Sequence, residues 1–65
     1  MRVTINEAAY ELPNAASVAE AVAAADPKPP FAVAVNLQFI PRAQYRSVAL
    51  HDADRIEIIS PVTGG

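Results

Sequence analysis

The sequence predicts a two-layer α+β domain, in which one main helix packs on one face of a mixed sheet of about five strands. Short runs in which apolar and polar residues alternate indicate strands near both ends of the chain and in its middle. Only one longer segment, residues 17–25, has helical periodicity instead. Sixty-five residues make a single domain, and one helix cannot cover both faces of a sheet.

The first two strands are expected to form a hairpin. Val3 and Ile5 alternate with polar neighbours, and a turn over residues 6–8 follows them. Tyr10 and Leu12 then alternate with a glutamate until a proline ends the second strand. The short separation of the two runs favours antiparallel pairing.

The main helix has a start signal and a stop signal. Ser17 and Glu20 form a capping box, in which a hydroxyl and a carboxylate satisfy two backbone N–H groups. Apolar side chains then recur on one helical face: Val18, Ala21, Val22 and Ala25. Three prolines within residues 27–30 end the helix and make the connection stiff and extended.

The second half of the chain predicts three more strands. Residues 31–35 and 39–40 are separated by a tight turn over 36–38, and residues 42–47 form about one helical turn. The last strand covers residues 55–60. The expected core consists of the inward apolar side chains Val3, Ile5, Val18, Val22, Phe31, Val33, Val35, Leu50, Ile56 and Ile58.

Composition excludes several classes of function. Without cysteine the chain has no disulfide, thiolate metal site or cysteine nucleophile, and a lone histidine, His51, cannot form a histidine cluster. The acidic residues are scattered, without the spacing of metal ligands, so no metal site is expected. A net charge of −2 argues against nucleic acid. Neither a signal peptide nor a membrane-length apolar run is recognisable, so a cytoplasmic protein is expected.

Glycine occurs only at positions 64 and 65, the last two of the sequence. At an average glycine usage of ~7%, an arbitrary chain ends in two glycines only ~0.5% of the time. A frayed terminus tolerates glycine, but glycine is absent from every expected turn, where it would be most useful. We therefore interpret Gly64 and Gly65 as functional residues on a flexible tail, residues 61–65.

A terminal Gly-Gly pair gives the backbone access to a slot too narrow for side chains, because glycine has no Cβ. The carboxylate of Gly65 is then the reactive group. A carboxylate is a poor electrophile, so it must first attack the α-phosphate of a nucleotide and become an acyl-adenylate. A sulfur or amine nucleophile can then displace AMP. A chain of this size has little room for a pocket that performs such an activation, so a partner enzyme is expected to supply it.

A β-β-α-β-β order in about 65 residues with a Gly-Gly end resembles the ubiquitin-like β-grasp sulfur carriers, and among them the ThiS family of thiamine thiazole biosynthesis. The resemblance covers the whole chain. The segments that carry it are residues 31–36, 40–42 with Tyr45, 52–58 and 62–65. The Gly-Gly end alone is less specific, since ubiquitin and the small subunit of molybdopterin synthase share it.

The resemblance implies a cycle in which this chain is a protein cosubstrate without a bound cofactor, and not an enzyme. A ThiF-like enzyme would use ATP and magnesium to adenylate Gly65, and a sulfur donor protein would convert the adenylate to a thiocarboxylate. A ThiG-like thiazole synthase would then take the sulfur. Val62, Thr63 and Gly64 would give the carboxylate access to these enzymes.

Two turns depart from the family pattern. Many members have Asn-Gly between the third and fourth strands and Gly-Asp before the last strand, where this chain has Asn36-Leu37 and Ala53-Asp54. Leucine and alanine tolerate a positive φ poorly. We therefore expect Asn36 and Asp52 to occupy any left-handed positions.

An apolar surface near the tail is a candidate for partner binding. Alternation places Ile59 on the sheet face that the helix leaves uncovered, beside Leu37, Phe39 and Val62. The alternative is a strand residue that is partly covered. Arg42, after a proline, is a further candidate for the partner surface, although plain solvent exposure would account for it equally well.

Other functions remain open from the sequence. A molybdopterin-synthase small subunit or a modifier conjugated to lysines would share the activation chemistry and differ in the acceptor. A non-catalytic interaction module would instead bind partners through its sheet edges, and its Gly-Gly end would be accidental.

Overall fold

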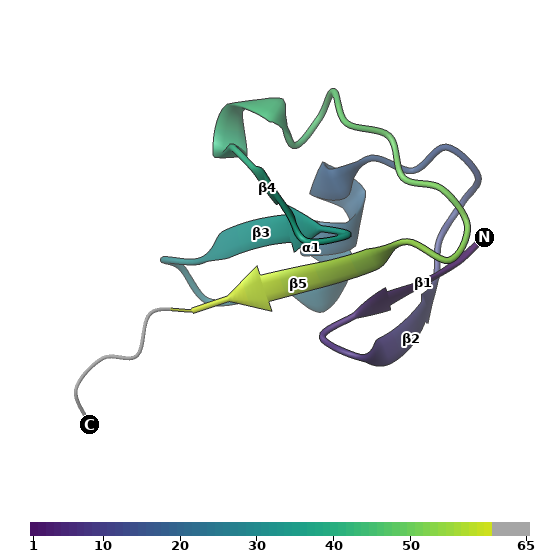
Figure 1. Cartoon of the computed structure of the whole chain (residues 1–65), viewed down its shortest axis with the longest axis horizontal. Helices are drawn as coiled ribbons and strands as arrows, with labels where there is room; N and C mark the ends of the chain where they lie inside the picture. The colour runs from purple at the N-terminus through teal and green to yellow at the C-terminus, as the bar shows by residue number, and fades with distance from the viewer. Residues whose placement is uncertain (61–65) are drawn as a thin grey trace.

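Within residues 1–60, five strands form one mixed sheet in which the last of these strands is central. A computed structural model describes residues 1–60, and the expected tail, residues 61–65, lies outside the described residues. The strand order is β2-β1-β5-β3-β4. The elements are β1 (Arg2–Ile5), β2 (Ala8–Glu11), α1 (Val18–Ala25), β3 (Ala32–Val35), β4 (Gln38–Ile40), η1 (Arg42–Gln44) and β5 (Arg55–Ile59). Helix α1 lies behind the sheet and leaves its other face uncovered (Figure 1). The predicted α+β architecture is confirmed.

Strand β5 pairs in parallel with β1 and antiparallel with β3, and the two outer pairs are antiparallel hairpins. The parallel register is short, with Thr4 opposite Arg55 and Ile5 opposite Ile56. The antiparallel register with β3 is longer, and it runs from Ala32 opposite Ile59 to Val35 opposite Ile56. A central parallel pair is possible because the connection between β1 and β5 spans almost the whole chain.

Asparagine side chains extend the pairing of β5 on both of its edges. The backbone N–H of Ile58 donates to Oδ1 of Asn6 at 2.8 Å, and Nδ2 of Asn6 donates to the carbonyl of Ile58 at 3.1 Å. On the other edge, the N–H of Arg55 donates to Oδ1 of Asn36 at 3.0 Å, and the N–H of Asn36 donates to the carbonyl of Arg55 at 2.8 Å. Both hairpin turns are therefore tied to the central strand.

The core lies between the sheet and α1. Seven of the ten expected core residues are buried, whereas Val22, Phe31 and Val35 are only partly buried. Val22 and Phe31 line an open groove beside α1, and Val35 lies at the end of its strand. Three buried residues were not expected: Ala16, Ala21 and Ile40.

The predicted capping box at the start of α1 is confirmed. Oγ of Ser17 accepts from the N–H of Glu20 at 3.3 Å, and the carboxylate of Glu20 accepts from the N–H of Ser17 at 3.1 Å. The helix ends at Asp26, whose left-handed backbone (φ 49°) directs its N–H to the carbonyl of Val22. The helix therefore stops one residue before the proline-rich connection.

The expectation for the left-handed positions was wrong in part. Asn36 has φ 50°, as expected, but Leu37 also has a positive φ of 70°. Positive φ at both central residues is typical of a type I′ two-residue hairpin turn, and Gln38 belongs to β4 and not to the turn. In the turn before β5, Ala53 (φ 72°) and not Asp52 is left-handed. The carboxylate of Asp52 accepts from the N–H of Arg2 at 2.8 Å and the N–H of Ala53 donates to the carbonyl of Arg2, which fixes this geometry.

We predict that Leu37→Gly stabilises the domain by roughly 0.5–1 kcal/mol. A left-handed backbone costs a residue with a Cβ about 1–2 kcal/mol, and the extra unfolded-state entropy of glycine offsets only part of this gain. The Leu37 side chain is 83% exposed, so little packing is lost. Thermal unfolding should show an increase of several degrees in the midpoint.

The matched variants of this test lie in the other hairpin. Glu7→Gly, at φ 70°, should stabilise in the same way. Ala8→Gly, in strand β2, should destabilise because no left-handed strain is relieved there. A lower midpoint for both Leu37→Gly and Glu7→Gly would contradict the assignment of strain to these turns.

Candidate functional site

The four tail residues predicted for the site, Val62, Thr63, Gly64 and Gly65, lie outside the described residues. The structure does describe the strand from which they continue. Ile59, the last residue of β5, lies opposite Ala32 at the start of β3. The position of this exit is fixed by hydrogen bonds, because β5 is the central strand and Asn6 holds Ile58 directly before it.

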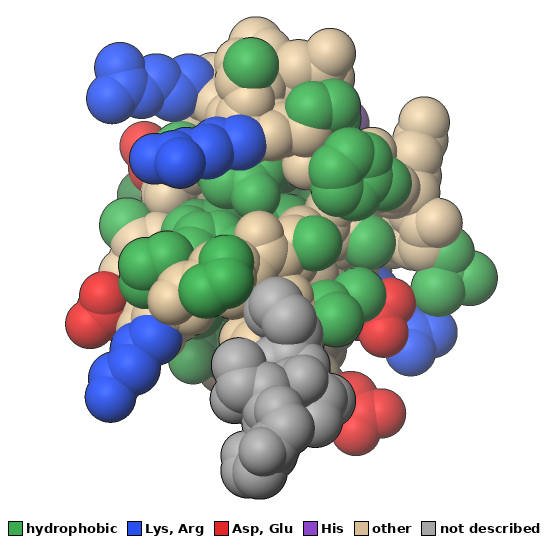
Figure 2. Space-filling model, turned by 90° about the vertical axis from the view of Figure 1, so that its left-hand side faces the viewer, with side chains coloured by type: hydrophobic (Ala, Val, Ile, Leu, Met, Phe, Trp, Pro, Cys, Tyr) green, Lys and Arg blue, Asp and Glu red, His purple; other side chains and the backbone are tan. Residues whose placement is uncertain are grey.

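The uncovered face of the sheet carries an apolar patch next to this exit. Leu37, Phe39 and Ile59 are the large hydrophobic residues exposed within residues 1–60, with exposed fractions of 83%, 64% and 57%. Phe39 pairs with Ala34, and Ile59 pairs with Ala32. We call these five residues the open-face patch. The exposure expected for Ile59 is confirmed, and Figure 2 shows hydrophobic side chains on both sides of the point where the described chain ends.

Strand geometry explains why Ile59 is exposed while its neighbour Ile58 is buried. Successive side chains of a strand point to opposite faces, so Ile58 packs against α1 and Ile59 faces away from it. The register with β1 has already ended at Ile56, and the β3 neighbour of Ile59 is the small Ala32. Neither adjacent strand therefore covers the Ile59 side chain.

The other end of the open-face patch has charged neighbours. Leu37 borders a small hollow of about 180 Å³ together with Asn36, Arg55 and Glu57. One cation and one carboxylate thus lie beside an exposed leucine. A partner that covers the patch would meet an apolar centre with charges at its edge, which is the usual anatomy of a protein interface.

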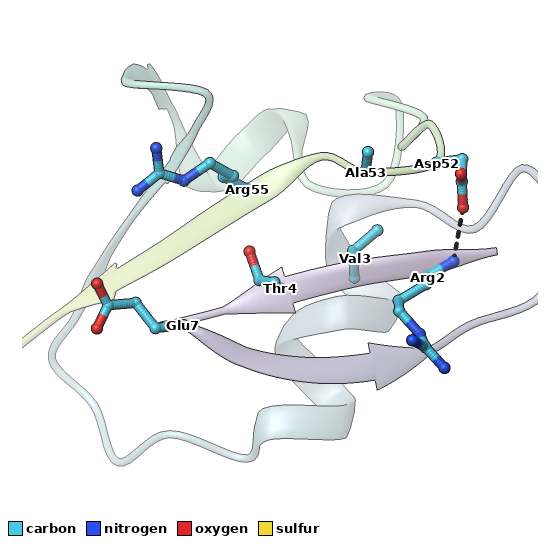
Figure 3. Close-up of a pocket in the computed structure, with 7 residues that line it drawn as sticks. All are labelled: Arg2, Val3, Thr4, Glu7, Asp52, Ala53 and Arg55. Atoms are coloured by element: carbon cyan, nitrogen blue, oxygen red, sulfur yellow. Dashed lines mark hydrogen bonds between the residues drawn. The ribbon is translucent and has the colours of Figure 1, made fainter.

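A second depression, of about 490 Å³, lies over β1 and β5 and is drawn in Figure 3. Glu7 and Arg55 lie at one end of it, and Arg2 and Asp52 lie at the other. Arg2 is already engaged, because its Nε donates to the carboxylate of Glu11 at 2.9 Å and its N–H donates to Asp52. These contacts hold the first strand in place, so we assign the depression a structural role.

Arg42 lies apart from the open-face patch. It is in η1, where it lines a groove with Tyr45 and residues of α1. The structure therefore brings Leu37, Phe39 and Ile59 to one face of the sheet and places Arg42 on the helix side. The sequence signal for this groove is the run of three prolines before Phe31. On sequence grounds the prolines predict only a stiff connection, and Phe31 is expected in a strand and in the core.

Groups suited to catalysis do not gather within residues 1–60. His51 is exposed and lies 3.8 Å from the carboxylate of Asp54, which also accepts from the N–H of His51 and from Nδ2 of Asn36. Asp54 therefore organises two turns. No group of three potential metal ligands occurs in this part of the chain. The same residues include no helix long and apolar enough to cross a membrane.

Comparison with known proteins agrees with this arrangement. The model of the ThiS family matches residues 3–65. The chain belongs to the ThiS family. It is thus a ubiquitin-like β-grasp protein of the sulfur-carrier type, as the sequence resemblance implied.

A solved structure has the same fold as this ThiS-family chain. The thiamine biosynthesis protein (ThiS) from Geobacter metallireducens superposes with a TM-score of 0.82, and the match covers all of both chains at 20% sequence identity. No curated protein sequence matches the chain. The structural likeness therefore supports the β-grasp architecture, and the family match shows that the chain belongs to the ThiS family.

We predict that Ile59→Lys leaves the fold intact and weakens binding to a partner that covers the open-face patch by about 1–3 kcal/mol. The aliphatic stem of lysine can lie on the sheet with its charge in water, whereas a buried interface would have to desolvate that charge. Thermal unfolding and calorimetric titration with a partner enzyme of thiamine biosynthesis measure the two effects.

Ile58→Lys is the matched control at the adjacent position. Ile58 belongs to the core, so this variant should unfold the domain. Unfolding of Ile59→Lys would place Ile59 in the core, and unchanged partner affinity would remove it from the interface.

Proposed function

We propose that this chain carries sulfur for the formation of the thiamine thiazole, with the carboxylate of Gly65 as the attachment point. The single observation that carries the proposal is the family match, which extends over residues 3–65 and so includes Gly64 and Gly65. The similar Geobacter structure is that of a thiamine biosynthesis protein, which favours the thiamine pathway over molybdopterin synthesis.

The proposed chemistry has three steps. A carboxylate oxygen of Gly65 attacks the α-phosphate of ATP in a ThiF-like enzyme, and pyrophosphate leaves with its magnesium ion. A persulfide of a donor protein then attacks the acyl carbon and displaces AMP, which gives an acyl disulfide. A thiol next attacks the donor's sulfur, so that a new disulfide forms and the thiocarboxylate is released. A ThiG-like thiazole synthase finally accepts the sulfur. The partners supply the nucleotide site and the metal, and this chain supplies the acyl group.

The fold suits a protein that is presented to other enzymes. An extended peptide advances about 3.3–3.6 Å per residue, so the five residues after Ser60 can span at most ~16–18 Å. That reach allows the domain to remain outside an active site while Gly65 enters it. The open-face patch lies beside the exit of β5, so we assign to it the docking of the adenylating enzyme.

Removal of Gly65 is the direct test of the proposal. We expect the shortened chain to fold as before, because terminal residues beyond the last strand contribute little to a core. It should support no ATP–pyrophosphate exchange by the cognate adenylating enzyme, since the reacting carboxylate is displaced by one residue. Normal exchange with the shortened chain would refute the carrier function.

Gly64→Val tests whether a side chain blocks the entry of the tail into the active site, without a change in the charge of the tail. The variant keeps the terminal carboxylate but adds a β-branched side chain next to it. Adenylation should fall by orders of magnitude while the thermal midpoint is unchanged. Gly64→Ala should give an intermediate rate, because its single methyl group obstructs less. Near-normal adenylation of Gly64→Val would show that the paired glycines are not needed for access.

A further inference from the structure

A groove of about 500 Å³ lies on the helix side of the molecule, away from the open-face patch. Its lining comes from three segments: α1, the proline-rich connection and η1. The residues are Ala19, Val22, Ala23, Pro29, Pro30, Phe31, Arg42 and Tyr45. Seven of these side chains are apolar or aromatic, and Arg42 is the one charged residue among them. The groove has room for one or two large apolar side chains.

The charge around this groove differs from that of the rest of the chain. Residues 27–51 contain Lys28, Arg42 and Arg46 but no aspartate or glutamate, although the whole chain has a net charge of −2. The ion pairs within residues 1–60 are Arg2–Glu11 and His51–Asp54, so none of these three cations pairs with a described carboxylate. On the left of Figure 2, hydrophobic side chains lie between Lys and Arg side chains above and below them, and an Asp or Glu side chain lies next to each of these two groups.

The nearest acidic residues, Glu20 and Asp26, form no ion pair with these cations. The carboxylate of Glu20 accepts from the N–H of Ser17 in the capping box, and Asp26 forms the left-handed end of the helix. Neither residue lines the groove. An apolar floor whose rim carries an arginine unpaired within residues 1–60 favours ligands that combine an apolar side chain with a carboxylate.

We propose that this groove binds a short acidic peptide segment of a partner protein, through one large apolar side chain on the floor and carboxylates next to Arg42. Lys28 and Arg46 are sequence neighbours of the lining residues Pro29 and Tyr45 and add positive charge near the groove. The groove lies in the helix layer and the open-face patch lies on the opposite face of the sheet, so both can be occupied at once. A second protein can therefore be recruited while an enzyme holds the tail.

The test is an NMR titration of the full-length ¹⁵N-labelled protein at low ionic strength. The probe is the peptide acetyl-Glu-Asp-Phe-Leu-Asp-Glu-amide, and the comparison is acetyl-Lys-Lys-Phe-Leu-Lys-Lys-amide. We expect saturable amide shifts with a Kd of about 1 mM for the acidic peptide, at Ala19, Ala23, Phe31 and Tyr45. The basic peptide should leave these amides unshifted. Equal shifts with both peptides, shifts confined to Phe39 and Ile59, or no shifts up to ~10 mM would overturn the proposal.

The chain offers a matched pair of variants on α1. Ala23 lines the groove, whereas its exposed neighbour Ala24 does not. Ala23→Glu should weaken the acidic peptide at least about tenfold, because it adds both bulk and a like charge to the site. Ala24→Glu makes the same chemical change outside the groove and should leave the affinity within about twofold. Equal affinities of the two variants would overturn the proposal.

Failure of this proposal is distinguishable from failure of the carrier function. Both alanine variants should fold, since glutamate is a good helix former at exposed positions, and thermal unfolding checks this. Both should be adenylated like the parent chain, because the groove takes no part in the chemistry at Gly65. Loss of peptide binding in Ala23→Glu with intact adenylation therefore reports on the groove alone.

Discussion

The hydrogen-bonded position of β5 is the constraint on which the rest of the molecule depends. This strand has β1 on one side and β3 on the other, and side chains of Asn6 and Asn36 add bonds to its backbone at both edges. Ile56 and Ile58 thereby face α1 and complete the core, while Ile59 must face outward. A shift of one residue would bury Ile59 and expose its neighbours, so the same pairing defines both the core and the docking patch.

The turns of this domain tolerate strain that glycine would avoid. Within residues 1–60, seven residues with a Cβ have positive φ: Asn6, Glu7, Ala15, Asp26, Asn36, Leu37 and Ala53. The asparagines also bond to β5, so their replacement by glycine would lose interactions. The Leu37 side chain is apolar and largely exposed, so it forms no such hydrogen bond to β5. This apolar side chain contributes to the open-face patch, which accounts for a leucine at a position that glycine would fit better.

Much of the fold was predictable because short-range patterns and tertiary structure agree. The capping box of Ser17 and Glu20, the alternation along β5 and the exposure of Ile59 all follow from local spacing. The errors arose where distant residues decide the outcome. Ala53 is left-handed because Asp52 is held by the backbone of Arg2, 50 residues away. The separation of Arg42 from Leu37 and Phe39 likewise depends on how η1 packs against α1, which no local pattern encodes.

The central place of the last strand has a consequence for how this protein is made. A chain still under synthesis can form its two hairpins, but β1 and β3 have no strand between them until β5 leaves the ribosome. The sheet therefore closes only after β5 has been translated, in contrast to domains that assemble progressively from the N-terminus. Prematurely terminated chains would expose two unpaired inner edges and be removed by proteases. Any folded copy in the cell would thus have been translated at least through β5.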